Sequence, residues 1–139
     1  MRVVLDTNVL VAALRNRDGA SFRIMELAYG RRFAPVVSVP LMIEYEEVLR
    51  RPEMVPDLGP EDIATFLDFF ASLAIPQPIY FLWRPLLSDA DDEMVAEVAA
   101  ASSADYLVTH NVRDFAAAES VFDFKTVTPR QFLAVVDAR

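Results

Sequence analysis

The stretch Val3-Val4-Leu5-Asp6-Thr7-Asn8 decides the fold, because it places a carboxylate directly after a short apolar run. A run of this length that is rich in β-branched residues is typical of a buried strand. Asp6 would then lie at the carboxyl end of that strand, the edge at which ligands bind in open α/β sheets. Asp6 is equally compatible with a simpler role, which is to cap a helix that begins near Val9.

Strand and helix patterns alternate along the rest of the chain. Strands are predicted at Val3–Leu5, Phe33–Val39, Asp105–Thr109 and Phe124–Val127, with Ile79–Leu82 as a strand or an extended link. Helices are predicted at Asn8–Leu14, Ser21–Tyr29, Pro40–Arg50, Gly59–Leu73, Asp89–Ser102, Asp114–Ser120 and Pro129–Asp137. This alternation implies βαβ units, so the expected fold class is α/β with a central, mostly parallel sheet between helical layers.

Composition indicates one compact domain, residues 1–139, with a substantial core, since 54% of the residues are hydrophobic. No apolar stretch reaches the roughly 18 residues of a membrane span, and the first residues do not resemble a signal peptide. The chain has no cysteine, which excludes thiolate metal sites and disulfides and suits a cytoplasmic protein.

The net charge of -8 argues against nucleic-acid binding through a broad basic surface. It leaves open a site where clustered carboxylates hold divalent cations that meet phosphates. The single histidine, His110, excludes a ribonuclease that uses two histidines as acid and base. A Ser-His-Asp triad would have to include His110, and no serine lies in a nucleophile-elbow motif.

Acidic side chains mark several places where a predicted strand gives way to a helix. The carboxyl ends of parallel strands emerge at one sheet edge, so four acids distant in sequence are expected to converge: Asp6, Glu44, Asp92 and Asp114. Each also has a simpler interpretation. Glu44 would be a solvated helix residue, Asp91 and Asp92 would interact with a helix dipole, and Asp114 would cap a helix.

A cluster of carboxylates suggests a particular chemistry. Like charges at one edge would repel one another and hold their protons more tightly without a cation. Oxygen ligands without cysteine or histidine favour Mg²⁺ or Mn²⁺ over zinc. These ions meet phosphate oxygens, which suggests phosphodiester hydrolysis with a metal-activated water.

Four motifs in this order resemble those of the PIN-domain family: Val4–Leu10, Ser38–Leu49, Asp89–Val95 and Ala104–Phe115. The similarity extends over nearly the whole chain. The branch it most resembles contains the VapC-type toxins of prokaryotic toxin–antitoxin pairs, and the ending Val127–Leu133 fits that branch as well.

This resemblance implies an α/β/α sandwich with an acidic pocket that binds Mg²⁺ or Mn²⁺ and cleaves RNA. By position, the catalytic and metal-binding acids would be Asp6, Glu44, Asp92 and Asp114, with Asp91 competing for the third place. The supporting polar residues would be Thr7, Asn8, Thr109, Asn111 and Arg113. Glu93 is a weaker candidate, and Glu46 and Glu47 are expected to face solvent.

The resemblance also implies partners, namely an RNA substrate, a cognate antitoxin and a second copy of the chain. The apolar stretches Phe22–Tyr29 and Phe66–Leu73 are either a dimer face or, as is more usual, core. Two alternatives remain. One is a non-catalytic PIN-like module that binds RNA or protein. The other is a haloacid-dehalogenase-type phosphatase, which needs a second aspartate where Asn8 stands and a lysine near the phosphate.

Overall fold

A five-stranded sheet forms the centre of the computed structural model, which describes residues 1–79 and 87–139. The strands are β1 (Arg2–Leu5), β2 (Ala34–Val37), β3 (Ile75–Pro76), β4 (Tyr106–Val108) and β5 (Lys125–Val127). They lie in the order β3-β2-β1-β4-β5, and every neighbouring pair is parallel. The predicted parallel sheet is therefore confirmed.

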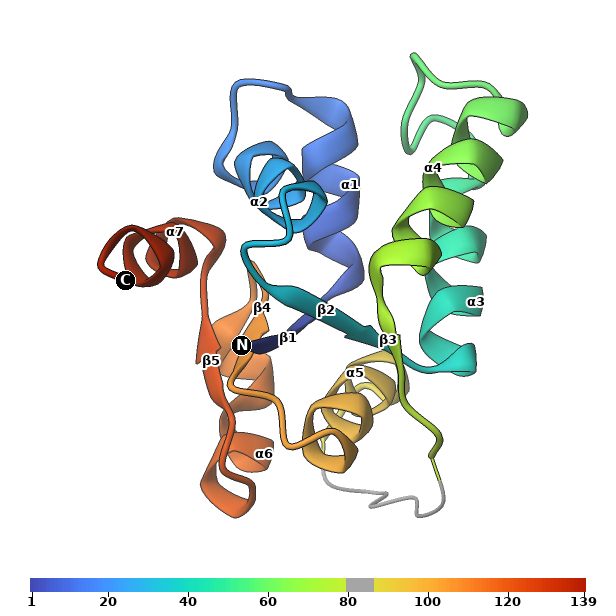
Figure 1. Ribbon diagram of the computed structural model, residues 1–139. Helices are drawn as coiled ribbons and strands as arrows, with labels where there is room; N and C mark the ends of the chain where they lie inside the picture. Colours follow the sequence, from blue (N-terminus) through green and yellow to red (C-terminus); the bar gives the residue numbers. More distant parts are fainter. Residues whose placement is uncertain (80–86) are drawn as a thin grey trace.

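Helices cover both faces of this sheet and complete the predicted α/β/α sandwich. Their bounds are α1 (Thr7–Arg15), α2 (Ala20–Tyr29), α3 (Val39–Leu49), α4 (Pro60–Leu73), α5 (Ala90–Ala101), η1 (Val112–Phe115), α6 (Ala116–Val121) and α7 (Pro129–Asp137). Helix α5 packs under β1, β2 and β4, whereas α1 and α2 lie on the opposite side (Figure 1). None of the helices in the described ranges is long and apolar enough to span a bilayer.

The order of the strands creates a topological switch point at the carboxyl edge of the sheet. From β1 the chain moves outward through β2 to β3, and it then returns to the other side of β1 as β4 and β5. Helices that follow β1 and β4 therefore leave toward opposite faces, and such a switch point is where open α/β sheets bind ligands. Asp6 follows β1, and Thr109 follows β4.

The core holds this edge in place. Strand β1 lies in the middle of the sheet, and its residues Val3, Val4 and Leu5 are buried from both faces. Tyr45 of α3 is fully buried and packs edge-on against Phe70 of α4, with ring centroids 5.8 Å apart. Its hydroxyl donates to the backbone oxygen of Leu5 at 2.5 Å, which connects α3 to the end of β1.

The edge strand on the β2 side lies earlier than predicted. It forms at Ile75–Pro76, between the predicted helix Gly59–Leu73 and the predicted segment Ile79–Leu82. A proline is tolerated here because an edge strand leaves one row of N–H groups unpaired. Of the predicted segment Ile79–Leu82, Ile79 belongs to no strand, and the remainder lies outside the described residues.

The two apolar stretches considered as a dimer face contribute largely to the core. Met25, Leu27 and Ala28 of α2 are buried, as are Leu67 and Phe70 of α4. Two aromatic rings from these stretches remain exposed, those of Tyr29 and Phe69, and they contact each other edge-on with centroids 5.0 Å apart.

Candidate functional site

Asp6 is a buried carboxylate with both oxygens hydrogen-bonded, and only 7% of the residue is exposed. Oδ1 accepts from the backbone N–H of Thr7 at 2.8 Å, which makes Asp6 the N-cap of α1. Oδ2 accepts from the hydroxyl of Thr109 at 2.7 Å. Asp6 therefore caps α1, but capping does not account for its second hydrogen bond. That bond comes from Thr109, which follows the neighbouring strand β4.

Thr109 connects the polar residues around Asp6. Its fully buried hydroxyl donates to Asp6 and accepts from the backbone N–H of Asn111 at 3.0 Å and from Nδ2 of Asn8 at 3.4 Å. Asn8 in turn accepts from the backbone N–H of His110 at 3.3 Å. The loop after β4 is thus fastened to the first turn of α1, and the structure brings Asn8, Thr109 and Asn111 together beside Asp6.

Glu44 and Asp92 lie in the electrostatic field of Asp6. Glu44 is buried although it sits on an otherwise half-exposed helix, with 8% of the residue exposed. Burial raises its pKa, Asp91, Glu47 and Asp6 raise it further, and Arg51 opposes them. Asp92 is half-buried at the start of α5. Burial and then Asp6 are the main causes that raise its pKa to about 7.

The remaining predicted site residues are more exposed, except Thr7. Asp114 lies in η1 and is exposed, yet its charge contributes to raising the pKa values of Asp6 and Asp92. Asp91 is exposed, and its backbone N–H donates to the Asp89 side chain at 2.8 Å. Arg113 and Asn111 are exposed, whereas Thr7 is buried.

The comparison with protein families identifies the chain. A family model described as the PIN domain matches residues 2–113. The chain belongs to the PIN-domain family. The match contains three of the four predicted acids and ends one residue before Asp114.

Solved structures share the fold of this PIN domain at low sequence identity. A chain of VapBC2 from Rickettsia felis, bound to a DNA fragment from its promoter, has a TM-score of 0.62 and 20% identity, with 92% of this chain and 98% of that chain covered. A chain of FitAB bound to the IR36 DNA fragment has a TM-score of 0.61 and 19% identity, with 91% and 94% covered. Among curated proteins, none shows significant similarity to this sequence.

The donor chemistry of the site fits a hard divalent cation. Within residues 1–79 and 87–139, no three histidine or carboxylate side chains are close enough, as they stand, to hold one ion. However, a carboxylate that accepts one hydrogen bond on each oxygen keeps further lone pairs. Burial is the first cause of the raised pKa values of Asp6, Glu44 and Asp92, and neighbouring carboxylates contribute to each of them. A cation among these acids would relieve that repulsion.

The sequence did not predict several contacts around this site that join residues far apart in the chain. Tyr45 reaches the end of β1, and Ser21 of α2 lies within 3.2 Å of the His110 ring. Glu93 and Glu97 of α5 are buried, and the Glu93 carboxylate accepts from the backbone N–H of Leu87. Only His110 had a visible signal in the sequence, since it is the single histidine and directly follows Thr109.

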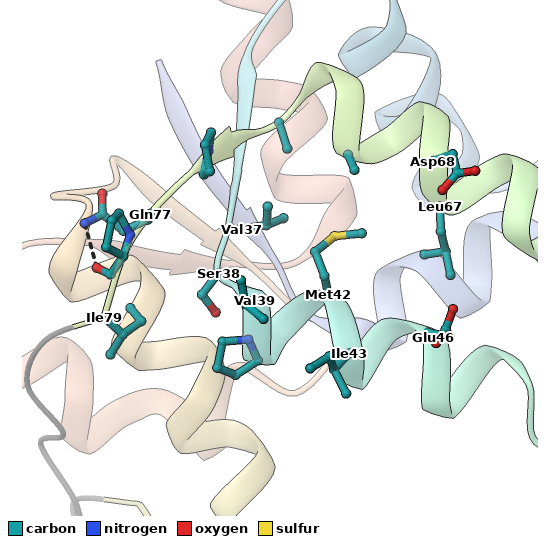
Figure 2. Close-up of a pocket in the computed structure, with 15 residues that line it drawn as sticks. Val37, Ser38, Val39, Met42, Ile43, Glu46, Leu67, Asp68, Gln77 and Ile79 are labelled. Carbon is teal, nitrogen blue, oxygen red and sulfur yellow. Dashed lines mark hydrogen bonds between the residues drawn. The ribbon is translucent and has the colours of Figure 1, made fainter.

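A large groove lies apart from the carboxylates. It has a volume of about 850 Å³ and lies between the start of α3, helix α4 and the segment after β3 (Figure 2). None of the predicted site residues lines it. Val39 and Ile43 of α3 face this groove together with Glu46, so α3 carries Glu44 toward the sheet edge and an apolar, partly acidic surface on another side.

The raised pKa of Asp92 predicts how the stability of the metal-free protein depends on pH. A carboxylate whose pKa is about 7 when folded and 3.8 ordinarily binds its proton more tightly in the folded state. Its stabilising contribution is therefore complete below about pH 4 and is lost as the pH rises through about 7. Between pH 5 and 8 we expect the free energy of unfolding to fall by about 1–2 kcal/mol, allowing for partial solvation.

Urea denaturation in the presence of a chelator, repeated across this pH range, measures the effect. Asp92→Asn should remove most of the decrease. Asp91→Asn, which changes an exposed side chain on the same turn, should remove less of it. A free energy of unfolding that increases from pH 5 to pH 8 in the unmodified chain would contradict the prediction.

Proposed function

We propose that this PIN domain is a Mg²⁺- or Mn²⁺-dependent endoribonuclease, and that it is the toxin of a toxin–antitoxin pair. One observation carries the proposal: Asp6 is buried at the switch point between β1 and β4, and Glu44, Asp92 and Asp114 lie within its electrostatic reach. Repelling carboxylates at a binding edge are costly to stability unless they serve a ligand.

In the proposed reaction the acids have distinct structural tasks. Asp6 and Glu44 are the proposed main ligands, because both are buried, Asp6 directly after β1 and Glu44 on α3, whose Tyr45 hydrogen-bonds the end of β1. Asp92 is the proposed third ligand, ahead of the more exposed Asp91, and Asp114 is the fourth. Thr109, Asn8, Asn111 and Thr7 hold the loop and the helix that present them. When bound, the cation supplies activation of the attacking water and neutralisation of charge on the phosphate.

The proposed partners follow from charge and from the related complexes. The two structural neighbours come from the VapBC2 and FitAB complexes, which supports an antitoxin partner for this chain. Because the chain has a net charge of -8, a basic antitoxin segment is the complementary choice for the acidic edge. RNA as substrate and a homodimer as the functional unit are part of the same proposal.

Both alternatives are less favoured by the geometry. A non-catalytic binding module has no need to bring four acids to one edge. A haloacid-dehalogenase-type phosphatase needs a lysine near its aspartate, but the chain's only lysine, Lys125, pairs with Tyr106 at the amino end of β5, at the opposite edge of the sheet.

Binding of Mn²⁺ discriminates between a nuclease and a scaffold. If the carboxylates bind the ion only in the folded chain, free Mn²⁺ at 100 times its dissociation constant should stabilise the protein by about 2.7 kcal/mol. Thermal unfolding with increasing Mn²⁺, compared with chelator, measures the shift. In parallel, a labelled single-stranded RNA should be cleaved with Mn²⁺ and remain intact with chelator. Absence of both effects would exclude the proposed activity.

A further inference from the structure

His110 lies beside the carboxylate site and is held there by one backbone contact and one side-chain contact. Its backbone N–H donates to Asn8 of α1, and its Nε2 lies 3.2 Å from the hydroxyl of Ser21 in the first turn of α2. His110 itself is exposed, and its Nδ1 has no hydrogen-bond partner among the described residues. One ring nitrogen is therefore anchored, and the other is free for a ligand.

Ser21 orients this ring and is not a nucleophile. Although a serine beside a histidine suggests nucleophilic catalysis, only 4% of Ser21 is exposed, so a substrate cannot reach its hydroxyl. No carboxylate hydrogen-bonds Nδ1 within the described part of the chain, so the third member of a triad is missing there. The remaining task for this buried hydroxyl is to fix the plane of the imidazole.

Together these contacts point to a substrate-binding role. We propose that His110 binds a phosphate group of the RNA beside the carboxylate site, and that Ser21 is the positioning residue for its imidazole. This inference rests on the proposed ribonuclease function.

Phosphate is the ligand that the surroundings favour. An edge lined with carboxylates repels a polyanion, so a neighbouring N–H donor is needed to hold the substrate backbone. An imidazole can supply that donor in its neutral or its protonated form. His110 directly follows Thr109, whose hydroxyl donates to Asp6, so His110 is next in sequence to a residue that supports a proposed metal ligand. Arg113 of the same loop is also a possible donor, but its side chain is exposed, and its backbone oxygen is what accepts a hydrogen bond, from the N–H of Ala116.

The test compares RNA binding and cleavage in His110 variants. His110→Ala should raise KM for a single-stranded RNA by about 10-fold or more, the change expected when a hydrogen bond to a charged group is lost, with a smaller change in kcat. His110→Arg, which restores N–H donors, should recover most of this loss. Ser21→Ala should raise KM less, by roughly 3-fold, because the ring remains but is less ordered.

Binding of the same RNA to an Asp6→Asn background, with and without His110→Ala, measures the contact without turnover, and it should weaken about 10-fold. Lys125→Ala is the control for loss of an N–H donor far from the site, since Lys125 lies at the far edge, and it should leave KM unchanged. An unchanged KM and an unchanged RNA affinity in His110→Ala would overturn the inference, as would a loss that His110→Arg does not recover. Cleavage by the unmodified chain is scored separately: if the chain binds RNA through His110 but never cleaves it, the nuclease proposal fails, and only the RNA contact of His110 is retained.

Discussion

Changing Asp6 to asparagine is expected to reduce metal-dependent RNA cleavage by more than about 100-fold. Loss of a residue that only supports a metal ligand typically costs 10–100-fold, and Asp6 is the central proposed ligand. Asparagine keeps the shape of the side chain and its Oδ1 acceptor for the N–H of Thr7, so the cap of α1 should survive. A gel assay with labelled RNA and saturating Mn²⁺ measures the loss.

The same variant should remain folded, which separates a catalytic effect from a structural one. Replacing a buried carboxylate that burial and Asp114 destabilise with a neutral amide should leave the metal-free protein about as stable as before. The thermal shift produced by Mn²⁺ should decrease or disappear. Full cleavage by Asp6→Asn would remove the proposed nuclease site from this edge of the sheet.

Glu44→Gln is expected to be nearly as damaging, whereas Glu46→Gln should be almost silent. The two glutamates are two positions apart on α3, but Glu44 is buried beside the other acids, and the Glu46 side chain is 55% exposed. Loss of a ligand should lower cleavage by about 100-fold or more, judged against the cost of losing a supporting residue. Loss of the exposed ion pair between Glu46 and Arg50, 3.6 Å apart, should cost no more than about 0.5 kcal/mol of stability.

Steady-state cleavage and Mn²⁺ titration of the two variants, measured side by side, provide a matched pair. Both variants replace one glutamate on the same helix, so helix propensity and net charge change equally. If Glu46→Gln proved as harmful as Glu44→Gln, the second ligand would have been assigned to the wrong face of α3, and the groove that Glu46 lines would become the relevant surface.

Most of the fold could be predicted because its signals are local. The run at β1 and the Gly, Pro and Thr residues at helix ends determine their elements from a few neighbouring residues. The observed helix Pro129–Asp137 has the predicted bounds. The edge strand at Ile75–Pro76 could not be predicted, because its two residues become a strand only by pairing with Val36 and Val37. A sequence window shows the proline but not the partner strand that makes it acceptable.

For the candidate site, the sequence could predict only which residues the strand topology brings to one edge of the sheet. Parallel strands bring Asp6 and the residues after β4 to one edge, and the structure does place Thr109 on Asp6. Which acids are the stronger candidates for metal ligands depends on the burial of their side chains, and the order of residues in the sequence does not reveal that burial. Glu93, the weaker candidate, is buried, and so is Glu97, which the sequence did not single out. The contact between Ser21 and His110 joins residues 89 positions apart, and no local sequence motif predicts it.

The hydrogen bond between Thr109 and Asp6 joins residues 103 positions apart, and it has a consequence for synthesis on the ribosome. Contacts of such long sequence separation form late in folding, because the intervening chain must be closed first. The acidic edge cannot be assembled until β4 has been made and has inserted beside β1. We therefore expect nascent chains that end before β4 to lack the proposed cleavage activity, because Asp6 cannot yet receive the hydrogen bond of Thr109.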